Sequence, residues 1–294
     1  MHRRHFLSSA VSIALAAGLW PRRGLSGMPE RQDAVAARLQ ALEADVGGRL
    51  GVYVVDTQSG AGYGYRPDER FLMLSSFKLL ASALVLHRVD AGLDSLARRI
   101  SYGREDLVPW SPVTGRHAGG EGMTLAGLCE AAVTTSDNTA ANLILASYGG
   151  PAALTAYLRQ LGDTVTRLDR NEPTLNDKHP HEPFDTTSPR AMVGSMRKLV
   201  LGEALSAASR ERLQQWLLGN TTGGRRLKAG LPADWRIGDK TGTAGMDAND
   251  VGVVWPPGRA PLLVAAYLAD SPAEGAAREA AIADVGRLLR DIAR

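Results

Sequence analysis

The sequence predicts a mixed α+β fold, in which one antiparallel sheet flanked by the first and last helices carries an inserted all-helical lobe. Strand patterns occur near both ends of the chain, at residues 50–65 and 235–269, whereas helical patterns fill the middle. Packing the terminal strands into one sheet is the most economical way to bury their apolar faces. We therefore expect an α/β lobe of residues 28–73 and 219–294, an all-α lobe of residues 74–218, and a ligand site between the lobes.

The strand signals are short apolar runs bounded by turn residues. Residues 50–55 and 63–65, with Ser59 and Gly60 between them, predict a hairpin near the start of the chain. Three later runs predict strands at residues 235–241, 251–255 and 262–269.

Apolar residues at helical spacing predict the flanking and central helices. Residues 30–46 form such a pattern and end at a glycine pair. Residues 76–86 are apolar almost all round, which indicates a helix buried on every side. A last helix is expected over residues 273–292, with Ser271 as its N-cap and Pro272 at its first position.

Residues 1–27 are expected to form a cleavable export signal. Arg3 and Arg4 precede a modestly apolar stretch at residues 8–20, which is typical of such signals and especially of the twin-arginine type. A frayed tail with two chance arginines is the alternative. Export predicts a periplasmic or secreted protein.

Net charge argues against nucleic acid as a partner. Residues 1–26 hold four of the 34 basic residues and no acidic residue, so cleavage leaves 30 basic against 31 acidic residues. This balance leaves no basic patch, and no apolar run reaches the roughly 20 residues that cross a bilayer. We expect a monomeric mature protein with a small-molecule substrate and no membrane contact.

The single cysteine and the six histidines give little support for redox or metal chemistry. Cys129 lies in an apolar helical pattern, so a buried core position is expected rather than a reactive thiol. His179 and His181 are close in sequence, but a proline separates them and no carboxylate pattern accompanies them. We expect no metal and no cofactor.

The first candidate catalytic pair is Ser75 and Lys78. Serine and lysine three residues apart lie on one face of a helical turn, where the amine can assist removal of the hydroxyl proton. The same spacing occurs at Ser195 and Lys198, which we interpret as a solvated amphipathic face. Lys78 differs because it begins a fully apolar helix, where an unpaired ammonium is costly.

A second candidate element is the run Ser136, Asp137 and Asn138, which stands between two helical patterns. Serine and aspartate are good N-caps, so a purely structural role explains this run equally well. Taken alone, the run favours the cap.

A third candidate element lies on a predicted strand and comprises Lys240, Thr241, Gly242 and Thr243. A lysine, two hydroxyls and a glycine that lets backbone approach closely suit an anionic substrate docked along the strand edge. Each of the three elements is common alone, whereas their combination in this order is not.

With these three elements in order, the chain resembles the class A serine β-lactamases along essentially its whole mature length. A fourth element, from Arg170 to Asn176, matches the family's Arg-x-Glu-Pro-x-Leu-Asn loop, and Asp185 matches the end of that loop. The resemblance implies a β-lactamase/transpeptidase-like fold, an Arg170–Asp185 pair that closes the loop, and a water held by Glu172 and Asn176.

The same resemblance implies a catalytic role for five residues. Ser75 is the nucleophile, and the backbone N–H groups of Ser75 and Thr243 form the oxyanion hole. Ser136 relays a proton to the leaving lactam nitrogen, and Glu172 activates the water that deacylates the enzyme. Whether Lys78 or Glu172 starts acylation is left open.

The resemblance also implies a set of substrate-binding residues. Asn138 is expected to bind the acylamide side chain of the substrate, and Trp110 to line the cleft entrance. The substrate carboxylate is assigned to Arg226, Lys240, Thr241 and Thr243. Gly242 and Asn176 are also counted among the substrate-binding residues.

The chain departs from the family at several positions. Leu74 and Ala244 replace a cysteine pair that some members carry, and Ser82 replaces the partner that Cys129 would need for another disulfide. The loop over residues 244–250 also looks about two residues shorter than is usual. Because this turn borders the site, it puts the substrate spectrum in doubt.

Two other functions stay open at the level of sequence. A D,D-peptidase of the penicillin-binding type shares the first three elements but does not need Glu172. A non-catalytic β-lactam sensor domain predicts a transmembrane anchor in a longer chain.

Overall fold

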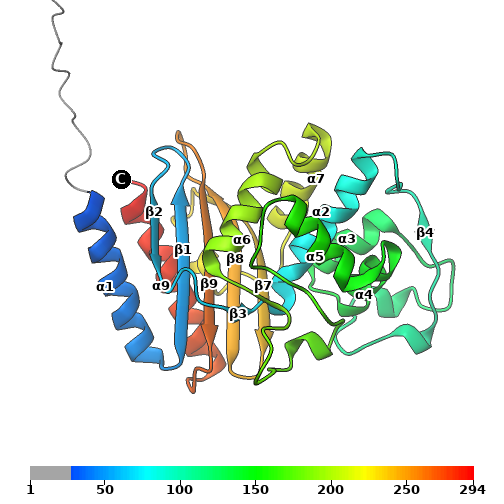
Figure 1. The fold of residues 1–294 in the computed structure, drawn as a ribbon, viewed down its shortest axis with the longest axis horizontal. Coiled ribbons are helices and arrows are strands. Elements are labelled where there is room, and N and C mark those ends of the chain that lie inside the picture. The colour runs from blue at the N-terminus through cyan, green and yellow to red at the C-terminus, as the bar shows by residue number, and fades with distance from the viewer. Residues whose placement is uncertain (1–27) are drawn as a thin grey trace, which may run out of the picture.

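The computed structural model describes residues 28–294, so the expected export signal lies outside the described residues. At the centre is a five-stranded antiparallel sheet with strand order β2-β1-β9-β8-β7 (Figure 1). The strands are β1 (Arg49–Asp56), β2 (Gly62–Tyr65), β7 (Arg236–Ala244), β8 (Asp247–Trp255) and β9 (Leu262–Ala269). The β1–β9 pair joins strands from the two ends of the chain, and the predicted α+β fold is confirmed.

Helices cover both faces of this sheet (Figure 1). One layer contains α1 (Met28–Val46), α8 (Leu227–Gly230) and α9 (Gly275–Ile292). The other side carries α2 (Phe77–Asp90), α3 (Leu125–Thr134), α4 (Asn138–Ser147), α5 (Gly150–Gln160), α6 (Pro189–Met196) and α7 (Ala207–Leu218). Two short strand pairs, β3 (Phe71–Leu72) with β6 (Thr186–Thr187) and β4 (Arg99–Ile100) with β5 (Met123–Thr124), brace the connections.

The sheet separates two hydrophobic cores. Successive side chains of a strand point to opposite faces, so a strand covered on both faces reads as a continuous apolar run. In β9, Leu263, Ala265 and Tyr267 pack into the core shared with the helical lobe. The alternate residues Leu262 and Val264 pack under α1 and α9 instead. This packing explains why β9 is buried along its whole length.

The central helix α2 is buried as the sequence predicts. Every residue from Phe77 to Leu86 is buried, and α3, α4, α5 and α7 surround the helix. A single 3₁₀ turn, Leu74–Ser76, leads into it. Ser75 and Lys78 therefore lie where the helical lobe meets the sheet.

The last helix begins later than expected. It starts at Gly275 with Glu274 as N-cap, rather than at residue 273 with Ser271 as N-cap. The Ser271 hydroxyl instead donates a hydrogen bond to the carbonyl of Val46, at 2.7 Å, which ties this turn to the end of α1.

The β7–β8 connection is also tighter than the sequence suggests. Strand β7 continues to Ala244 and β8 begins at Asp247, so only Gly245 and Met246 form the turn. Ala244 and Asp247 pair across it. The expected loop over residues 244–250 is therefore mostly strand, because the polar residues of this segment continue the ladder.

Two smaller expectations have mixed outcomes. Cys129 is fully buried, as predicted, and burial raises the pKa of its thiol to about 12. Lys198 is exposed, but Ser195 is buried and donates to Asp163 Oδ2 at 2.8 Å. The prediction of a solvated face at Ser195 was therefore wrong, because the hydroxyl satisfies a buried carboxylate.

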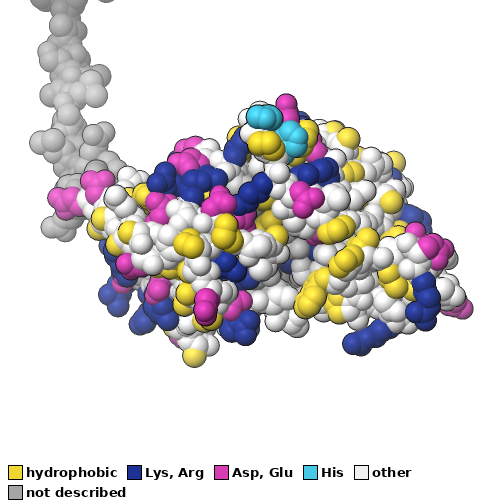
Figure 2. Space-filling model, turned by 90° about the horizontal axis from the view of Figure 1, so that it is seen from below, with side chains coloured by type: hydrophobic (Ala, Val, Ile, Leu, Met, Phe, Trp, Pro, Cys, Tyr) yellow, Lys and Arg dark blue, Asp and Glu magenta, His cyan; other side chains and the backbone are white. Residues whose placement is uncertain are grey.

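The surface carries charges of both signs intermixed on the face that Figure 2 shows. Among the described helices, none is both long and apolar enough to cross a membrane.

Two helical glycines give a test of packing between α8 and α9. A Cβ on Gly286 of α9 would lie 2.3 Å from the carbonyl oxygen of Leu227, whereas a Cβ on Gly194 of α6 would meet nothing within 4 Å. We expect Gly286→Ala to lower the free energy of unfolding by about 1–3 kcal/mol through overpacking. Gly194→Ala should raise it by about 0.5–1 kcal/mol because alanine is the better helix former.

Urea unfolding of both variants beside the parent measures this difference. Equal stability of Gly286→Ala and the parent would contradict the close α8–α9 approach. That approach matters for the site because Leu227 follows Arg226 directly.

Candidate active site

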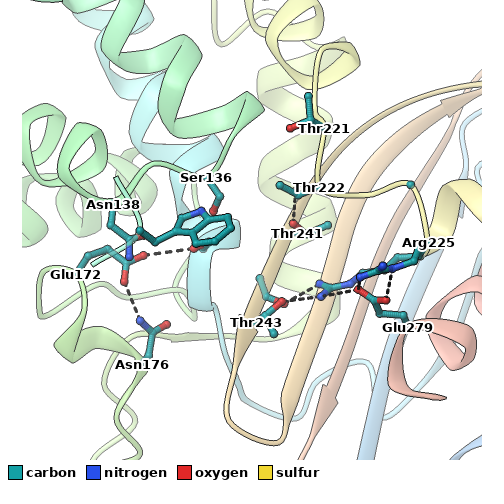
Figure 3. Close-up of a pocket in the computed structure, with 15 residues that line it drawn as sticks. Ser136, Asn138, Glu172, Asn176, Thr221, Thr222, Arg225, Thr241, Thr243 and Glu279 are labelled. Atoms are coloured by element: carbon teal, nitrogen blue, oxygen red, sulfur yellow. Dashed lines mark hydrogen bonds and ion pairs between the residues drawn. The ribbon is translucent and has the colours of Figure 1, made fainter. Parts of the chain in front are cut away.

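A cavity of about 660 Å³ lies between β7 and the helical lobe (Figure 3). Sequence-predicted residues line much of it: Ser75, Trp110, Ser136, Asn138, Glu172, Asn176, Arg226, Thr241, Gly242 and Thr243. Lys78 and Lys240 lie fully buried behind this lining. Residues far apart in sequence are thus gathered at the boundary of the two predicted lobes.

The Ser75 hydroxyl lies between an amine and a carboxylate. Lys78 Nζ is 2.9 Å from Ser75 Oγ, and Ser75 Oγ is 3.3 Å from Glu172 Oε1. Lys78 Nζ and Glu172 Oε1 are themselves 3.1 Å apart, with both side chains almost completely buried. Two groups able to accept a proton therefore contact the same hydroxyl.

The surroundings of Lys78 set its protonation. Burial lowers the pKa of its amine below the ordinary 10.5, and the neighbouring Glu172 carboxylate opposes that shift. Nζ also donates to the Ser136 carbonyl at 2.9 Å and to Asn138 Oδ1 at 2.5 Å. These acceptors satisfy an amine that would otherwise be costly to bury.

Ser136 stands between two lysines. Its hydroxyl is 3.0 Å from Lys240 Nζ and 3.4 Å from Lys78 Nζ. Burial first, and the nearby Lys78 charge second, hold the pKa of Lys240 well below its usual value. A hydroxyl bonded to two buried amines is suited to passing a proton.

The residues on either side of Ser136 explain its position. Ser136 has a positive φ of 60°, which few residues other than glycine adopt. Asp137 caps α4 by accepting from Ala140 N at 2.9 Å, and its carboxylate also accepts three hydrogen bonds from Val113 and Thr114. The cap that the sequence favoured here is present. It anchors the loop that presents Ser136 to the lysines.

The segment carrying Glu172 is closed at its base by an ion pair. Arg170 Nε donates to the buried Asp185 carboxylate at 2.7 Å. Asn142 of α4 then fixes the peptide of Glu172 from both sides, since its amide accepts from Glu172 N and donates to Glu172 O, each at 2.9 Å. The sequence gives no signal for Asn142, because it lies inside an ordinary helical pattern.

The two carboxylate oxygens of Glu172 have different partners. Oε1 contacts Ser75 and Lys78, whereas Oε2 accepts from Asn176 Nδ2 at 2.7 Å. Figure 3 shows Asn176 and Glu172 together on the side of the cavity opposite Thr243. A polar group held by both residues would lie next to the nucleophile.

Arg226 is more deeply placed than a direct substrate contact requires. Its guanidinium donates to the carbonyls of Gly242 and Asn249, at 2.8 and 2.7 Å, and to the Thr243 hydroxyl at 2.6 Å. Only 5% of the side chain is exposed, and burial lowers the pKa of the guanidinium. Arg226 therefore acts on the cavity largely through Thr243.

Gly242 has a packing reason as well as a possible substrate contact. A Cβ there would lie 2.8 Å from Leu74 Cβ and 2.3 Å from Asn249 Oδ1. Leu74 itself has a positive φ of 48°, in the turn that presents Ser75. The glycine therefore lets β7 approach the turn that carries the nucleophile.

Trp110 and Asn138 form one edge of the opening. Trp110 is 64% exposed, and its indole N–H donates to the Thr135 carbonyl at 3.1 Å. Asn138 N donates to the Trp110 carbonyl, and Asn138 Nδ2 to the Pro109 carbonyl, at 2.9 and 2.8 Å. The exposed ring on a strained residue, with φ of 64°, is consistent with a loop rather than a core position.

Sequence reasoning missed part of the cavity wall. The missed residues are Thr221, Thr222, Gly224, Arg225 and Glu279. Glu279 of α9 pairs with Arg225 at 2.6 Å and with Arg226 at 3.7 Å (Figure 3). The neighbouring residues Arg225 and Arg226 were the signal in the sequence that could have indicated this part of the wall. Their acidic partner is about 50 residues away, where no local pattern points to it. Within residues 28–294, no group of three or more His, Cys, Asp or Glu side chains is arranged to hold a metal.

Comparisons with known proteins agree with this geometry. The family model described as "Beta-lactamase enzyme family" matches residues 34–293. A carbapenem-hydrolysing β-lactamase KPC from Klebsiella oxytoca is 47% identical over 290 residues, covering 98% of this chain and 96% of the relative.

Two solved structures are also similar to this chain. An ancestral class A β-lactamase is 59% identical, with a TM-score of 0.86 over 88% of this chain and 99% of that one. The putative class A β-lactamase PenP from Rhodopseudomonas palustris is 55% identical, with a TM-score of 0.87 over 88% and 100%. The chain therefore belongs to the class A serine β-lactamase family.

Proposed function

We propose that this protein hydrolyses the amide bond of β-lactam antibiotics through an acyl-enzyme on Ser75, and so confers resistance to them. The observation that supports this most directly is the position of Glu172. Its carboxylate contacts the nucleophile at 3.3 Å through one oxygen and Asn176 at 2.7 Å through the other. A water held there is both activated and aimed at an acyl group on Ser75.

In the acylation step, Ser75 Oγ attacks the lactam carbonyl and its proton passes to Lys78 or Glu172. Both groups are within reach of Oγ, so either can serve. The backbone N–H groups of Ser75 and Thr243 stabilise the oxyanion, a kind of contact that typically contributes about 10²–10³ in rate. Ser136 delivers a proton to the nitrogen as the C–N bond breaks, and Lys78 and Lys240 replenish it.

Substrate binding divides between the two walls of the cavity. Thr241, Gly242 and Thr243 bind the substrate carboxylate on the β7 side, with the buried Lys240 charge behind them and Arg226 acting through the Thr243 hydroxyl. Asn138 binds the acylamide, and Trp110 covers the entrance. In the deacylation step, Glu172 takes a proton from water as the water attacks the ester carbonyl. As the ester C–O bond breaks, that proton passes to Ser75 Oγ, directly or through Lys78, which restores the free hydroxyl.

The D,D-peptidase alternative is disfavoured because it gives no role to Glu172 and Asn176 at this position. The sensor alternative likewise has no use for them. We also propose that the mature protein is an exported monomer in the periplasm or outside the cell, after removal of residues 1–27. We assign residues 28–73 and 219–294 to its α/β lobe and residues 74–218 to its all-α lobe.

Turnover of nitrocefin by the purified protein tests the proposed function. We expect sustained hydrolysis over many enzyme equivalents, because the acyl-enzyme is released by the Glu172-activated water. A single burst equal to the enzyme concentration would support the penicillin-binding alternative, and absence of any acylation would support neither enzyme.

Glu172→Ala should slow deacylation by about 10²–10⁴, since it removes the general base while Lys78 remains beside Ser75. Mass spectrometry should then find an acyl adduct on Ser75 after mixing with a penicillin. The matched control is Glu182→Ala, which removes an exposed carboxylate from the outer part of the same loop and should leave turnover intact. Rapid turnover in Glu172→Ala would refute the assigned base.

A further inference from the structure

The segment between α7 and α8 carries a short chain of hydrogen bonds that ends at the cavity. Asn220 Nδ2 donates to Asp239 Oδ2 at 2.7 Å, and Asp239 is only 2% exposed. Asn220 Oδ1 accepts from Thr222 N at 3.1 Å and from the Thr222 hydroxyl at 2.8 Å. The Thr222 hydroxyl also contacts the hydroxyl of Thr241 on β7 (Figure 3). Thr222 therefore links a fixed side-chain amide to a residue assigned to the substrate carboxylate.

This segment is held on both sides of Thr222. The backbone N–H and the hydroxyl of Thr221 both donate to the carbonyl of Thr134, the last residue of α3, each at 2.9 Å. On the other side, a Cβ on Gly223 would collide with Asp239 Oδ2, so glycine there lets the chain pass the buried carboxylate. The two hydroxyls of Thr222 and Thr241 therefore meet without any change of the backbone.

The positions of the hydroxyl protons follow from the partners of Thr222. A threonine hydroxyl has one proton to donate, and an amide oxygen only accepts. The proton of Thr222 is therefore used on Asn220 Oδ1. The contact between the two hydroxyls is then made with the Thr241 proton, which points toward Thr222 and away from the cavity. In this state Thr241 presents only lone pairs to the cavity that it lines.

A carboxylate in the cavity needs the opposite direction. Because a carboxylate only accepts, Thr241 must turn its proton into the cavity to bind it. The contact between the hydroxyls then persists only if Thr222 turns its own proton from Asn220 to Thr241. Asn220 Oδ1 still accepts from Thr222 N, so it keeps a partner. A hydroxyl that accepts one hydrogen bond donates a stronger one, because successive hydrogen bonds polarise one another.

We propose that Thr222 is a positioning residue, which turns its proton to Thr241 when the substrate carboxylate binds and so makes Thr241 a stronger donor to that carboxylate. Asn220 is the acceptor that gives up this proton. The inference rests on the proposed function, in which Thr241 contacts the carboxylate. Thr222 lines the same cavity wall, so a direct contact between Thr222 and the substrate is the alternative that the test must separate.

Thr222→Val tests the proposal, since it keeps the shape of the side chain and removes the hydroxyl. The measured quantity is the ratio of kcat/KM for benzylpenicillin to kcat/KM for its methyl ester, which has no carboxylate charge. We expect this ratio to fall about five-fold, the size of effect that one net hydrogen bond supports. Thr222→Ser keeps the hydroxyl and should hold the ratio within about two-fold of the parent.

A double-mutant cycle with Thr241→Val separates the indirect role from a direct contact. If Thr222 acts through Thr241, then Thr222→Val should change the ratio by less than about two-fold once Thr241 is valine. The full loss in that background would show that Thr222 contacts the substrate itself, and would overturn the inference.

Thr155→Val is the matched control for general stability. The hydroxyl of Thr155 in α5 donates to the carbonyl of Leu168 and accepts from Leu168 N, each at 2.9 Å, outside the cavity. Its loss should leave the ratio unchanged, and an equal fall of the ratio in this variant would count against the proposal.

An unchanged ratio in Thr222→Val, with the parent active, would overturn this inference and leave the proposed function standing. A merely structural role of Thr222 gives that result, because it lowers both kcat/KM values in proportion. A parent that hydrolyses neither benzylpenicillin nor its ester would overturn the inference and the proposed function together.

Discussion

The Lys78 amine is enclosed on every side, and most of the site follows from how the protein satisfies it. A buried cation needs a nearby carboxylate and hydrogen-bond acceptors, or it gives up its proton. Glu172 supplies the charge, while the Ser136 carbonyl and Asn138 supply the acceptors. Glu172 lies in a loop, whereas Ser136 and Asn138 stand on either side of the N-cap residue of α4. The contacts that satisfy this one amine therefore bring the reacting groups together around Ser75.

The position of Glu172 next to the Lys78 amine also distinguishes an enzyme that is only acylated by a β-lactam from one that hydrolyses it. In the proposed mechanism, Ser75 is the nucleophile of acylation, Lys78 or Glu172 takes its proton, and Ser136 relays a proton to the leaving nitrogen. Release of the acyl group needs, in addition, a base that can activate a water beside Ser75. We assign this role to Glu172 because its two oxygens are divided between the nucleophile and Asn176, and because Asn142 holds its peptide in place.

Much of this arrangement could be predicted from the sequence, since it rests on local patterns. The apolar helix behind Lys78 distinguished Ser75 from Ser195, and the burial of α2 agrees with that choice. What could not be predicted depends on pairs distant in sequence. Ser271 bonds to Val46 rather than capping α9, and Glu279 reaches the cavity from a helix whose pattern signals only packing. Gly242 was assigned to substrate approach, whereas its contacts with Leu74 and Asn249 appear only in three dimensions.

The protonation of Lys78 is the quantity on which the account depends most directly. Carbon-13 NMR of the Lys78 Cε, titrated in the parent and in Glu172→Gln, measures it. Burial should place the pKa of the parent below 10.5. Loss of the Glu172 charge should lower it further, because that carboxylate favours the charged amine. A pKa at or above 10.5, or one that does not respond to Glu172→Gln, would contradict the proposed coupling between the buried amine and the deacylating base.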